Sequence, residues 1–582
     1  MSRLEELARQ PPTSPGAAGP EGAARGRWRR CVSGTVTTLC LLVLWIALLL
    51  PFDTRDLTVG VLLRVPGEAL VLLLAALVLP ARLGRRSLRV VGVLLGLVCV
   101  VEVVDLAFDT VLDRPVDPVN DWVYLRAGLE VLAQSVGWTG AVAVAVVVIL
   151  LALGVVAALP MALLRATDLA RRHRRPAALV LLGLASVWVV AAGFGWERSP
   201  RAPVAAWNVA DRVVAKVSLT REALADRSVF RAEIADDPMR GLPARELVTG
   251  LDGKDVLIVV VESYGRVAVE DPVLSPRIDE LLERGTRRLE AVGLGSCSAF
   301  LTSSTYGAAS WLAHATLQSG LRVDSQHRYN QLLADQRLTL TRIFDRAGWR
   351  TLMVAPGTTH DWPEGQRFYG FDELYGTDDL GYAGPSFGFG SMPDQFTLAA
   401  LQRLELARGD RPPVMAEVSL TSSHHPWTPL PPVIDPAELG DGSVYDRIPP
   451  VGSSAEATFG SPEAVRTAYA RSIEYSIGSV LDFLESEAGR DLVVVLLGDH
   501  QPHGYVSGDR AGHDVPISLI ARDPRVLDRI ASWGWEPGLD PSPDAPVTAM
   551  ETFRDRFLSA VGAPLEAYPR SSAASPGGSC RA

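Results

Sequence analysis

The chain has 582 residues, a hydrophobic content of 48% and a formal net charge of −10. This length predicts more than one domain, and an acidic chain without a basic stripe in its C-terminal half argues against nucleic-acid binding. Five cysteines are too few for a disulfide-built fold. A single bridge between Cys297 and Cys580 is the pairing left open in the C-terminal half.

The first 200 residues contain long apolar segments. Each is near the roughly 20 residues needed to cross a bilayer, and soluble proteins rarely contain several such runs. We therefore predict a transmembrane domain of five helices, with spans at 35–52, 59–79, 90–106, 140–163 and 177–194.

The charges between these spans predict an orientation. The N-terminal tail and the connections after the second and fourth spans are rich in arginine, whereas the other two connections are mixed to acidic. Basic connections stay in the cytoplasm. We therefore expect a multi-pass protein of the cytoplasmic membrane, with its N-terminus in the cytoplasm and the chain after about Trp196 outside.

Composition and patterning suggest domain boundaries. The two ends are rich in small residues and proline and are expected to be disordered, and the part after the spans is long enough to bury a core of its own. The predicted division is a cytoplasmic tail, a transmembrane domain, a juxtamembrane linker with a helix, a large outer domain and a second tail, at 1–30, 31–196, 197–250, 251–564 and 565–582.

Within the outer domain, apolar runs alternate with helical patterns. Strands are predicted at 255–262, 350–355, 413–420, 493–497 and 515–521, and helices at 278–284, from Ser310, and at 339–347, 395–408 and 461–487. This alternation predicts an α/β fold with a doubly wound, mainly parallel sheet that helices cover on both faces.

Two of the predicted strands end in groups that are hard to bury. The run ending at Leu497 is followed by Gly498-Asp499-His500, and the run ending at Val261 is followed by Glu262. Open α/β sheets bind ligands at the carboxyl ends of their strands. Two carboxylates and an imidazole at one rim predict a metal site made by Glu262, Asp499 and His500.

A hydroxyl-rich segment, 302–320, turns helical near Ser310. A hydroxyl at a helix N-terminus lies where free N–H groups favour an anion, and a neighbouring metal makes it a nucleophile. His314 falls on the same helix face and is a candidate for binding the anionic oxygens of a substrate. The alternative is an ordinary serine cap of a structural helix.

These motifs carry a resemblance over about 254–521. The outer domain resembles the sulfatase-like branch of the alkaline phosphatase superfamily, and is most similar to membrane-anchored lipoteichoic acid synthases and, more distantly, phosphoethanolamine transferases. Glu262 in Val-Val-Glu-Ser-Tyr-Gly and Asp499-His500 in Leu-Gly-Asp-His match the family's metal ligands. The resemblance implies one divalent cation (Mn, Mg or Zn) and a helix-start serine or threonine as nucleophile and fourth ligand.

The resemblance also implies roles for further residues. Gly307, Ser319 and Gly320 match the register of the family around Ser310, with Thr305 as the alternative nucleophile because Ser303 and Ser304 make the same loop polar. In the segment 421–427, His424 takes the place of the histidine that contacts the substrate or protonates the leaving group. The other implied substrate contacts are His425 and Trp362; Glu364 stands where synthases show an arginine.

The predicted function is that of a membrane-anchored, metal-dependent phosphotransferase or hydrolase. It would act on anionic esters of lipids or envelope glycopolymers through a covalent serine or threonine intermediate. One alternative is a sulfuric ester hydrolase, although Leu312 and His314 stand where sulfatases place a proline and an arginine. An alternative of another class is a non-catalytic envelope sensor or scaffold, which the complete set of metal-type ligands argues against.

Overall fold

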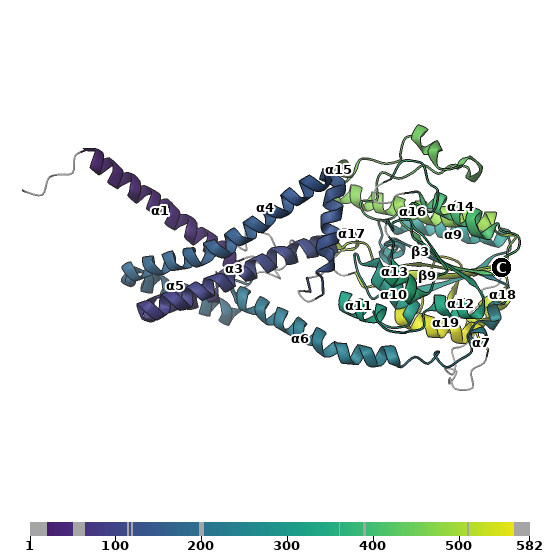
Figure 1. The fold of residues 1–582 in the computed structure, drawn as a ribbon, viewed down its shortest axis with the longest axis horizontal. Helices are drawn as coiled ribbons and strands as arrows, with labels where there is room; N and C mark the ends of the chain where they lie inside the picture. Colours follow the sequence, from purple (N-terminus) through teal and green to yellow (C-terminus); the bar gives the residue numbers. More distant parts are fainter. Residues whose placement is uncertain are drawn as a thin grey trace, which may run out of the picture. The chain divides into compact units, whose positions relative to one another are not determined.

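The computed structural model describes residues 20–49, 64–112, 116–117, 120–196, 203–359, 361–387, 392–508 and 511–563. The chain divides into two compact units (Figure 1). The first holds residues 1–110 and 114–221, and the second holds 111–113 and 222–582, so that the boundary falls within helix α6 (Asn208–Ala235). The Cys297–Cys580 pairing that the sequence left open and the C-terminal tail involve positions outside the described residues.

The N-terminal unit contains four helices that are long and apolar enough to cross a membrane, among the residues that the structure describes. They are α1 (Pro20–Leu49), α3 (Ala81–Leu112), α4 (Val123–Arg172) and α5 (Arg174–Phe194). Their apolar side chains are largely unburied: those from Val146 to Leu151 are each 49–65% exposed. Helices with exposed apolar surface of this extent fit a membrane anchor.

The prediction of five spanning helices is wrong for the described residues. Where the second span was expected, the structure has a two-residue strand, β1 (Val65–Pro66), followed by the short apolar helix α2 (Gly67–Val78). Twelve residues of helix extend about 18 Å, too little for a bilayer core of about 30 Å. Pro66 and Pro80 flank this helix, and a proline removes a backbone donor and restricts the residue before it. Residues 59–63 of the predicted span lie outside the described part.

Charged side chains of the anchor pair with helix α6. Glu102 on α3 meets Arg212 at 3.3 Å, and Asp105 meets Lys216 at 2.6 Å. The carboxylates that the sequence places near one end of the third span are therefore paired, which is the usual condition for charges at that depth.

The C-terminal unit is built on a nine-stranded sheet with the order β10-β4-β9-β8-β3-β7-β5-β6, in which β11 also pairs with β4. The strands are β3 (Asp255–Val261), β4 (Gly295–Thr302), β5 (Arg350–Val354), β6 (Glu373–Tyr375), β7 (Val414–Leu420), β8 (Leu492–Gly498), β9 (Asp514–Ala521), β10 (Glu536–Pro537) and β11 (Val547–Ala549).

The sheet is mixed, so the expectation of a mainly parallel sheet holds only for part of it. Strands β8, β3, β7, β5 and β6 run parallel, but β9 is antiparallel to both β8 and β4. Strand β4 was not predicted. Its sequence, Gly-Ser-Cys-Ser-Ala-Phe-Leu-Thr, consists largely of small and polar residues, which give neither an apolar run nor a clear alternation.

Helices cover both faces of this sheet (Figure 1). Alternate residues of β3 point to opposite faces: Val259 packs in a core with α9 (Ser275–Ala291), α14 (Asp394–Leu401) and α16 (Pro462–Ser486), and Val260 packs in a second core with α10 (Ser310–Ser319), α12 (Leu340–Ala347) and α19 (Phe553–Val561). As predicted, Ser461 caps α16, because its side chain accepts from the backbone N–H of Ala464.

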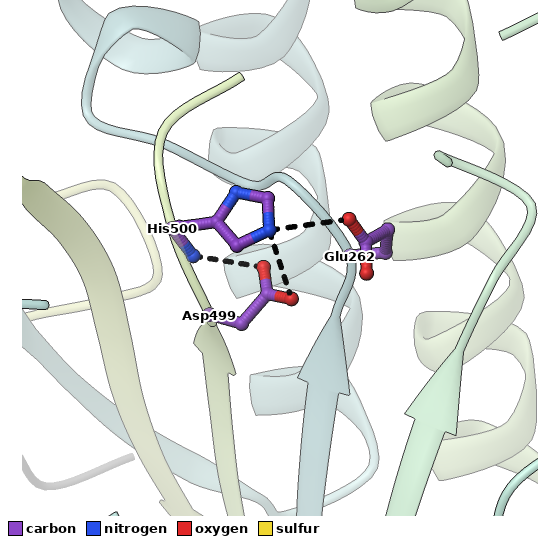
Figure 2. A group of neighbouring side chains, drawn as sticks. All are labelled: Glu262, Asp499 and His500. Carbon is purple, nitrogen blue, oxygen red and sulfur yellow. Dashed lines mark hydrogen bonds and ion pairs between the residues drawn. The ribbon is translucent and has the colours of Figure 1, made fainter. Parts of the chain in front are cut away.

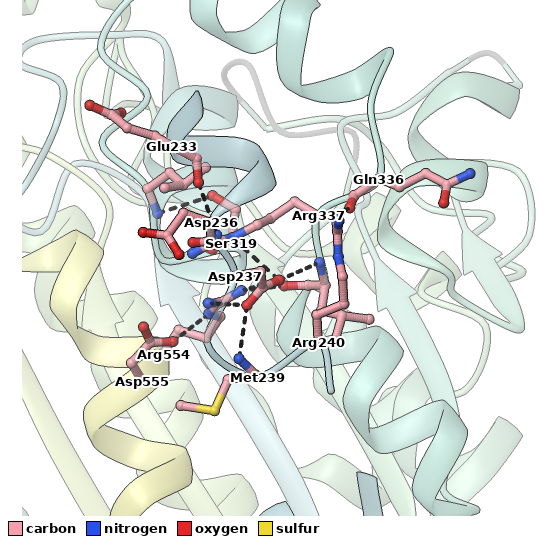
Figure 3. Close-up of polar contacts among 12 residues, drawn as sticks. Glu233, Asp236, Asp237, Met239, Arg240, Ser319, Gln336, Arg337, Arg554 and Asp555 are labelled. Carbon is pink, nitrogen blue, oxygen red and sulfur yellow. Dashed lines mark hydrogen bonds and ion pairs between the residues drawn. The ribbon is translucent and has the colours of Figure 1, made fainter. Parts of the chain in front are cut away.

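A buried ion cluster fixes the segment that follows α6 (Figure 3). Asp237 is fully buried and pairs with Arg554 on α19 at 3.0 Å and with Arg337 at 3.5 Å. Arg337 also donates to the carbonyl of Ser319 at 3.0 Å. The cluster thus ties this segment to α19 and to the last residue of α10, the helix that begins at Ser310.

Candidate active site

The strand register brings three sequence motifs to one edge of the sheet. Val261, the last residue of β3, is aligned with Gly498 at the end of β8 and with Leu420 at the end of β7. The three strands are parallel, so the residues that follow them emerge side by side. These residues are Glu262, the pair Asp499-His500, and the segment 421–427 that carries His424.

Close backbone contacts hold these strand ends together. The N–H groups of Ser263 and His500 both donate to Oδ1 of Asp499, each at 2.8 Å. A side chain at Gly498 would collide with the carbonyl of Tyr264, which explains the glycine of the Leu-Gly-Asp-His motif. Ser263 adopts a φ of 57°, which is uncommon for a residue other than glycine.

The three predicted metal ligands converge at this edge (Figure 2). Nε2 of His500 lies 3.4 Å from Oε1 of Glu262 and 3.6 Å from Oδ2 of Asp499. One ligand atom from each residue lies within 4.8 Å of the other two. Asp499 and His500 are 2% and 1% exposed, so two carboxylates and an imidazole share a water-poor space.

The hydrogen bonds of this cluster fit a bound cation. Nδ1 of His500 lies 2.7 Å from the carbonyl oxygen of Gln501, and a carbonyl only accepts, so Nδ1 donates in this contact and Nε2 is the ring nitrogen that faces the carboxylates. Oδ2 of Asp499 is buried without a hydrogen-bond partner in the described part of the chain. A buried carboxylate oxygen without a partner is costly, and a divalent cation would satisfy both atoms.

The charges at the site shift its pKa values in opposite directions. Burial, reinforced by the charge of Glu262, raises the pKa of Asp499. Burial also opposes ionisation of Glu262, but His500 and His424 outweigh it and lower the pKa of that carboxyl to about 2. Burial disfavours the charged form of His500, and the two carboxylates more than offset this and raise its pKa. Such opposed shifts are typical of functional sites.

Ser310 completes the cluster. Its hydroxyl donates to Oε2 of Glu262 at 2.9 Å and lies 3.2 Å from Nε2 of His500. Ser310 is the first residue of α10, as predicted, and the preceding Ala309 has a φ of 68°. A left-handed alanine costs about 1–3 kcal/mol and is found mostly where function requires it. The chain accepts this strain directly before the candidate nucleophile.

The loop before α10 is pinned to the strand that carries the ligands. The hydroxyl of Ser303 donates to the carbonyl of Asp499 at 2.5 Å, and the N–H of Gly307 donates to the carbonyl of Gln501 at 3.1 Å. Thr305, the alternative nucleophile, lies within this loop. Its side chain is buried, and its Oγ1 makes no hydrogen bond within the described residues, so no such bond links it to Glu262.

His424 follows β7 on a loop that a buried carboxylate shapes. Asp394 accepts from the N–H groups of Thr421 and Ser422 at 2.9 and 3.0 Å and from the hydroxyl of Ser476 at 2.6 Å. Burial raises the pKa of Asp394. Nδ1 of His424 lies 2.7 Å from the carbonyl oxygen of His425, so Nδ1 donates in this contact, and the side chain lines the cavity beside Ser310 and Glu262.

The two other predicted substrate contacts lie in different surroundings. Trp362 lines a cavity together with Ser310, His314 and His424. His425 instead packs against Trp427, Phe459 and Tyr505 with ring centroids 5.2–6.3 Å away. Burial, with the neighbouring His424 and His503, lowers the pKa of His425 to about 4. His425 is not among the residues that line this cavity.

The cavity has a volume of about 310 Å³ and opens beside the cluster. Its polar end includes Glu262, Ser310 and Asp499, and the remaining lining is mainly apolar and aromatic, including Trp311, Met353, Trp362, Tyr369 and Phe371. Aromatic walls with a few convergent polar groups are typical of small-molecule sites.

Sequence reasoning missed one residue of this cavity. Glu417 lies in the middle of β7, is 2% exposed at its side chain, and binds Nδ1 of His314. A carboxylate inside the apolar run Val-Met-Ala-Glu-Val-Ser-Leu was the available signal, because buried carboxylates need a partner.

Comparison with known proteins gives a family for this domain. The sulfatase family model matches residues 254–518. No curated protein matches the chain.

Solved structures resemble it at low identity. The lipoteichoic acid synthase LtaP from Listeria monocytogenes is 15% identical, over 55% of this chain and 74% of that chain, with a TM-score of 0.35. The phosphoglycerol transferase GacH from Streptococcus pyogenes is 12% identical, over 59% of this chain and 91% of that chain, with a TM-score of 0.32; the periplasmic domain of the phosphoethanolamine transferase EptC from Campylobacter jejuni is 11% identical, over 54% of this chain and 96% of that chain, with a TM-score of 0.33. Similarity at this level does not define a substrate for this chain. The match to the sulfatase family model spans the strand-end motifs from Glu262 to Asp499-His500, so residues 254–518 are similar to a sulfatase domain.

Proposed function

We propose that this chain is a membrane-anchored phosphotransferase or phosphodiesterase that acts on anionic esters of lipids or envelope glycopolymers outside the cytoplasmic membrane. The observation that carries the proposal is the position of the Ser310 hydroxyl, bonded to Glu262 and 3.2 Å from Nε2 of His500, at the polar end of the cavity. A hydroxyl in this position is suited to act as a nucleophile rather than only as a helix cap.

Glu262, Asp499, His500 and Ser310 are the residues that would hold a divalent cation of the Mn, Mg or Zn type. When bound, such a cation lowers the pKa of a coordinated hydroxyl and offsets the charge of the carboxylates. Three of these residues would serve only as ligands, and the fourth, Ser310, would also be the reacting group, which is the arrangement expected of a catalytic rather than a structural site.

The residues of the chain then define the chemical steps. The Ser310 oxygen, its proton lost to solvent, forms a bond to phosphorus while the bond between phosphorus and the departing alkoxide oxygen breaks. His424, protonated at Nε2, gives that proton to the departing oxygen, which leaves as an alcohol. A second alcohol or a water then attacks the phosphoserine, gives up its proton to His424 and frees Ser310.

The aromatic wall of the cavity supports a role in binding the uncharged part of the ester. Trp362 and Tyr369 lie against each other with centroids 5.5 Å apart, so their positions are mutually fixed. Rigid aromatic surfaces bind an apolar or sugar group with little loss of side-chain freedom. The wall is therefore suited to the group that stays attached to phosphorus during transfer.

The placement outside the membrane rests on the last two anchor helices. Arg171 and Arg172 end α4, and Arg174 and Arg175 begin α5. Basic connections stay in the cytoplasm. Helix α5 then leads the chain to the opposite side, and this holds whether the helices before α3 cross the membrane once or twice.

The experiment that tests the proposal compares Ser310→Ala with Thr305→Ala. Full-length chain in detergent is assayed with bis(4-nitrophenyl) phosphate and Mn²⁺. We expect no turnover from Ser310→Ala, turnover from Thr305→Ala, and a phosphorylated peptide containing Ser310 when the wild type is quenched with acid. Normal turnover from Ser310→Ala would contradict the proposal, and a modified Thr305 would move the role to that residue.

Sulfate ester hydrolysis is a second candidate, and the sulfatase family model is the observation that favours it. Sulfatases oxidise their nucleophile to an aldehyde. Mass spectrometry of the peptides containing Ser310 and Cys297 distinguishes the two: an aldehyde at either residue supports sulfate ester hydrolysis, and an unmodified serine at position 310 supports ester transfer by a hydroxyl.

A further inference from the structure

The cavity must accept a negatively charged substrate if the proposed function is correct. A phosphate or sulfate ester brings at least one negative charge, and none of the described residues that line the cavity is a lysine or an arginine. Among the described lining residues outside the metal cluster, the side chains that can carry a positive charge are the two histidines, His314 and His424. The side chain of His314 is 11% exposed and lines the cavity.

His314 is fixed at one ring nitrogen. It lies one helical turn after Ser310 on α10, and Nδ1 binds Oε1 of Glu417 in a short hydrogen bond. A carboxylate accepts, so Nδ1 carries the proton of this bond. Nε2 makes no hydrogen bond within the described residues and is therefore the nitrogen available to a substrate.

Glu417 is fixed in turn by Gln318. The side-chain amide of Gln318 donates to Oε2 of Glu417 at 2.5 Å, while its oxygen accepts from both N–H and hydroxyl of Thr341 at 3.1 Å. Because Thr341 donates twice to the oxygen, the amide nitrogen must face Glu417. Both oxygens of this buried carboxylate are thus taken, one by each partner.

The electrostatics agree with this geometry. Burial alone would lower the pKa of His314, but the hydrogen bond and the charge of Glu417 outweigh burial and raise it. The carboxylates Asp499 and Glu262 act in the same direction. A partner carboxylate behind a histidine fixes its tautomer and ring orientation, and such partners affect function nearly as much as the residues that they orient.

We propose that Glu417 and Gln318 are positioning residues that hold His314 with an Nε2 proton directed at a non-bridging oxygen of the ester that Ser310 attacks. The inference rests on the proposed function and adds to it the group that meets the negative charge of the substrate. Neither Glu417 nor Gln318 touches the reacting atoms. Their effect passes through the imidazole.

The test measures binding of inorganic phosphate and turnover of bis(4-nitrophenyl) phosphate by full-length chain with Mn²⁺. His314→Gln, Glu417→Gln and the double variant are compared with the wild type. We expect both single variants to lose about 10- to 100-fold in phosphate affinity and in kcat/KM, and the double variant to lose no more than His314→Gln. Phosphate affinity and turnover at wild-type levels in Glu417→Gln would overturn the inference.

A matched control separates positioning from stability. Glu405 is also fully buried, accepts from Arg350 at 2.7 and 2.8 Å and from the hydroxyl of Tyr375, and does not line the cavity. Glu405→Gln should lower Tm with phosphate affinity unchanged. An equal loss of phosphate affinity in Glu405→Gln and Glu417→Gln would show that Glu417 acts on stability and not on the position of His314, and would overturn the inference.

Two further variants keep the outcomes distinguishable. Ser310→Ala should bind phosphate but should not turn over the diester. Turnover by Ser310→Ala would contradict the proposed function. The phosphate affinities of the His314 and Glu417 variants would still test the inference about His314. If Glu417→Gln does not fold, Gln318→Met keeps the carboxylate but removes the bond that orients it. Unchanged phosphate affinity in Gln318→Met would then overturn the inference.

Discussion

The hydroxyl of Ser310 donates to Oε2 of Glu262 at 2.9 Å, across 48 positions of the chain. The two residues come from the start of α10 and the end of β3, and helix α9 and strand β4 lie between these elements in the chain. Their contact turns two ordinary features, a helix start and a strand end, into one candidate reaction centre.

Glu262→Gln should separate metal binding from folding. The amide keeps the size of the side chain and its hydrogen bond from Ser310, but it removes one of two negative charges that attract a cation. We expect Mn²⁺ affinity, measured by isothermal titration calorimetry, to fall about 10- to 100-fold, with Tm of the metal-free chain within about 2 °C of the wild type. Wild-type affinity in this variant would exclude Glu262 as a ligand.

His424→Ala should slow the reaction in a way that depends on the leaving group. A general acid contributes about 10²- to 10⁴-fold when the departing alcohol is a poor leaving group, and little for 4-nitrophenol, which leaves as an anion. The ratio of kcat/KM for the nitrophenyl diester to kcat/KM for an alkyl ester, which reports only the steps up to phosphoserine formation, should therefore rise in this variant. His425→Ala, which alters a ring outside the cavity lining, is the matched control. A uniform loss with both substrates would contradict the role of His424 as acid.

Reporter fusions test the predicted orientation of α5. In a bacterial host, a phosphatase reporter that needs disulfide bonds is active only outside the cytoplasm. We expect activity for a fusion after Gly195 and none for a fusion after Arg172, with a fluorescent reporter giving the opposite pattern. Activity at both positions, or at Arg172 alone, would place the sulfatase-like domain on the wrong side of the membrane for the proposed function.

Asp237→Asn should destabilise the C-terminal unit and change its acid sensitivity. The variant removes the buried negative charge shared by Arg554 and Arg337, leaving Asp555 as the carboxylate partner of Arg554; breaking a buried ion pair typically costs about 3–5 kcal/mol. Burial opposes the charge of Asp237, but Arg554 and Arg337 outweigh it and hold its pKa below the ordinary 3.8. A folded-state pKa below the unfolded one stabilises the protein above about pH 4, and this stability is lost as the pH falls through the lower value.

The measurement is urea unfolding of wild type and variant between pH 7 and pH 3. The difference in the free energy of unfolding should be largest near neutral pH and should shrink toward pH 3. Arg525→Ala, which removes an arginine with an 83% exposed side chain from Asp523, should change stability by less than about 0.5 kcal/mol. A difference between Asp237→Asn and wild type that grows on acidification would contradict the assigned sign.

The metal cluster was accessible from sequence because its ligands directly follow apolar strands. Glu262 and Asp499-His500 each end a run that can only be a buried strand or helix, and parallel strands bring such ends together. Ser310 was accessible because hydroxyl-rich residues precede a helical pattern. Each of these sequence signals is local, and the parallel strands of the sheet then bring the residues that carry them close together.

Other features of the fold and the site could be found only in the three-dimensional structure. Glu417 binds His314 across 103 positions, and nothing in a strand sequence says which helix covers which residue. Strand β9 runs antiparallel to both of its neighbours, β4 and β8, and makes the sheet mixed. Its apolar run does not differ from the runs of the parallel strands. The short helix α2 replaced a predicted span because the hydropathy of residues 59–79 continues across Pro66, where the helix begins only at Gly67.

The most direct test of the central claim is an anomalous difference map from crystals of the chain grown with MnCl₂. We predict one strong peak at about 2.0–2.4 Å from oxygens of Glu262 and Asp499, Nε2 of His500 and Oγ of Ser310, and no peak there in crystals of Asp499→Asn. A fully ordered wild-type site without anomalous density between these four side chains would contradict the account.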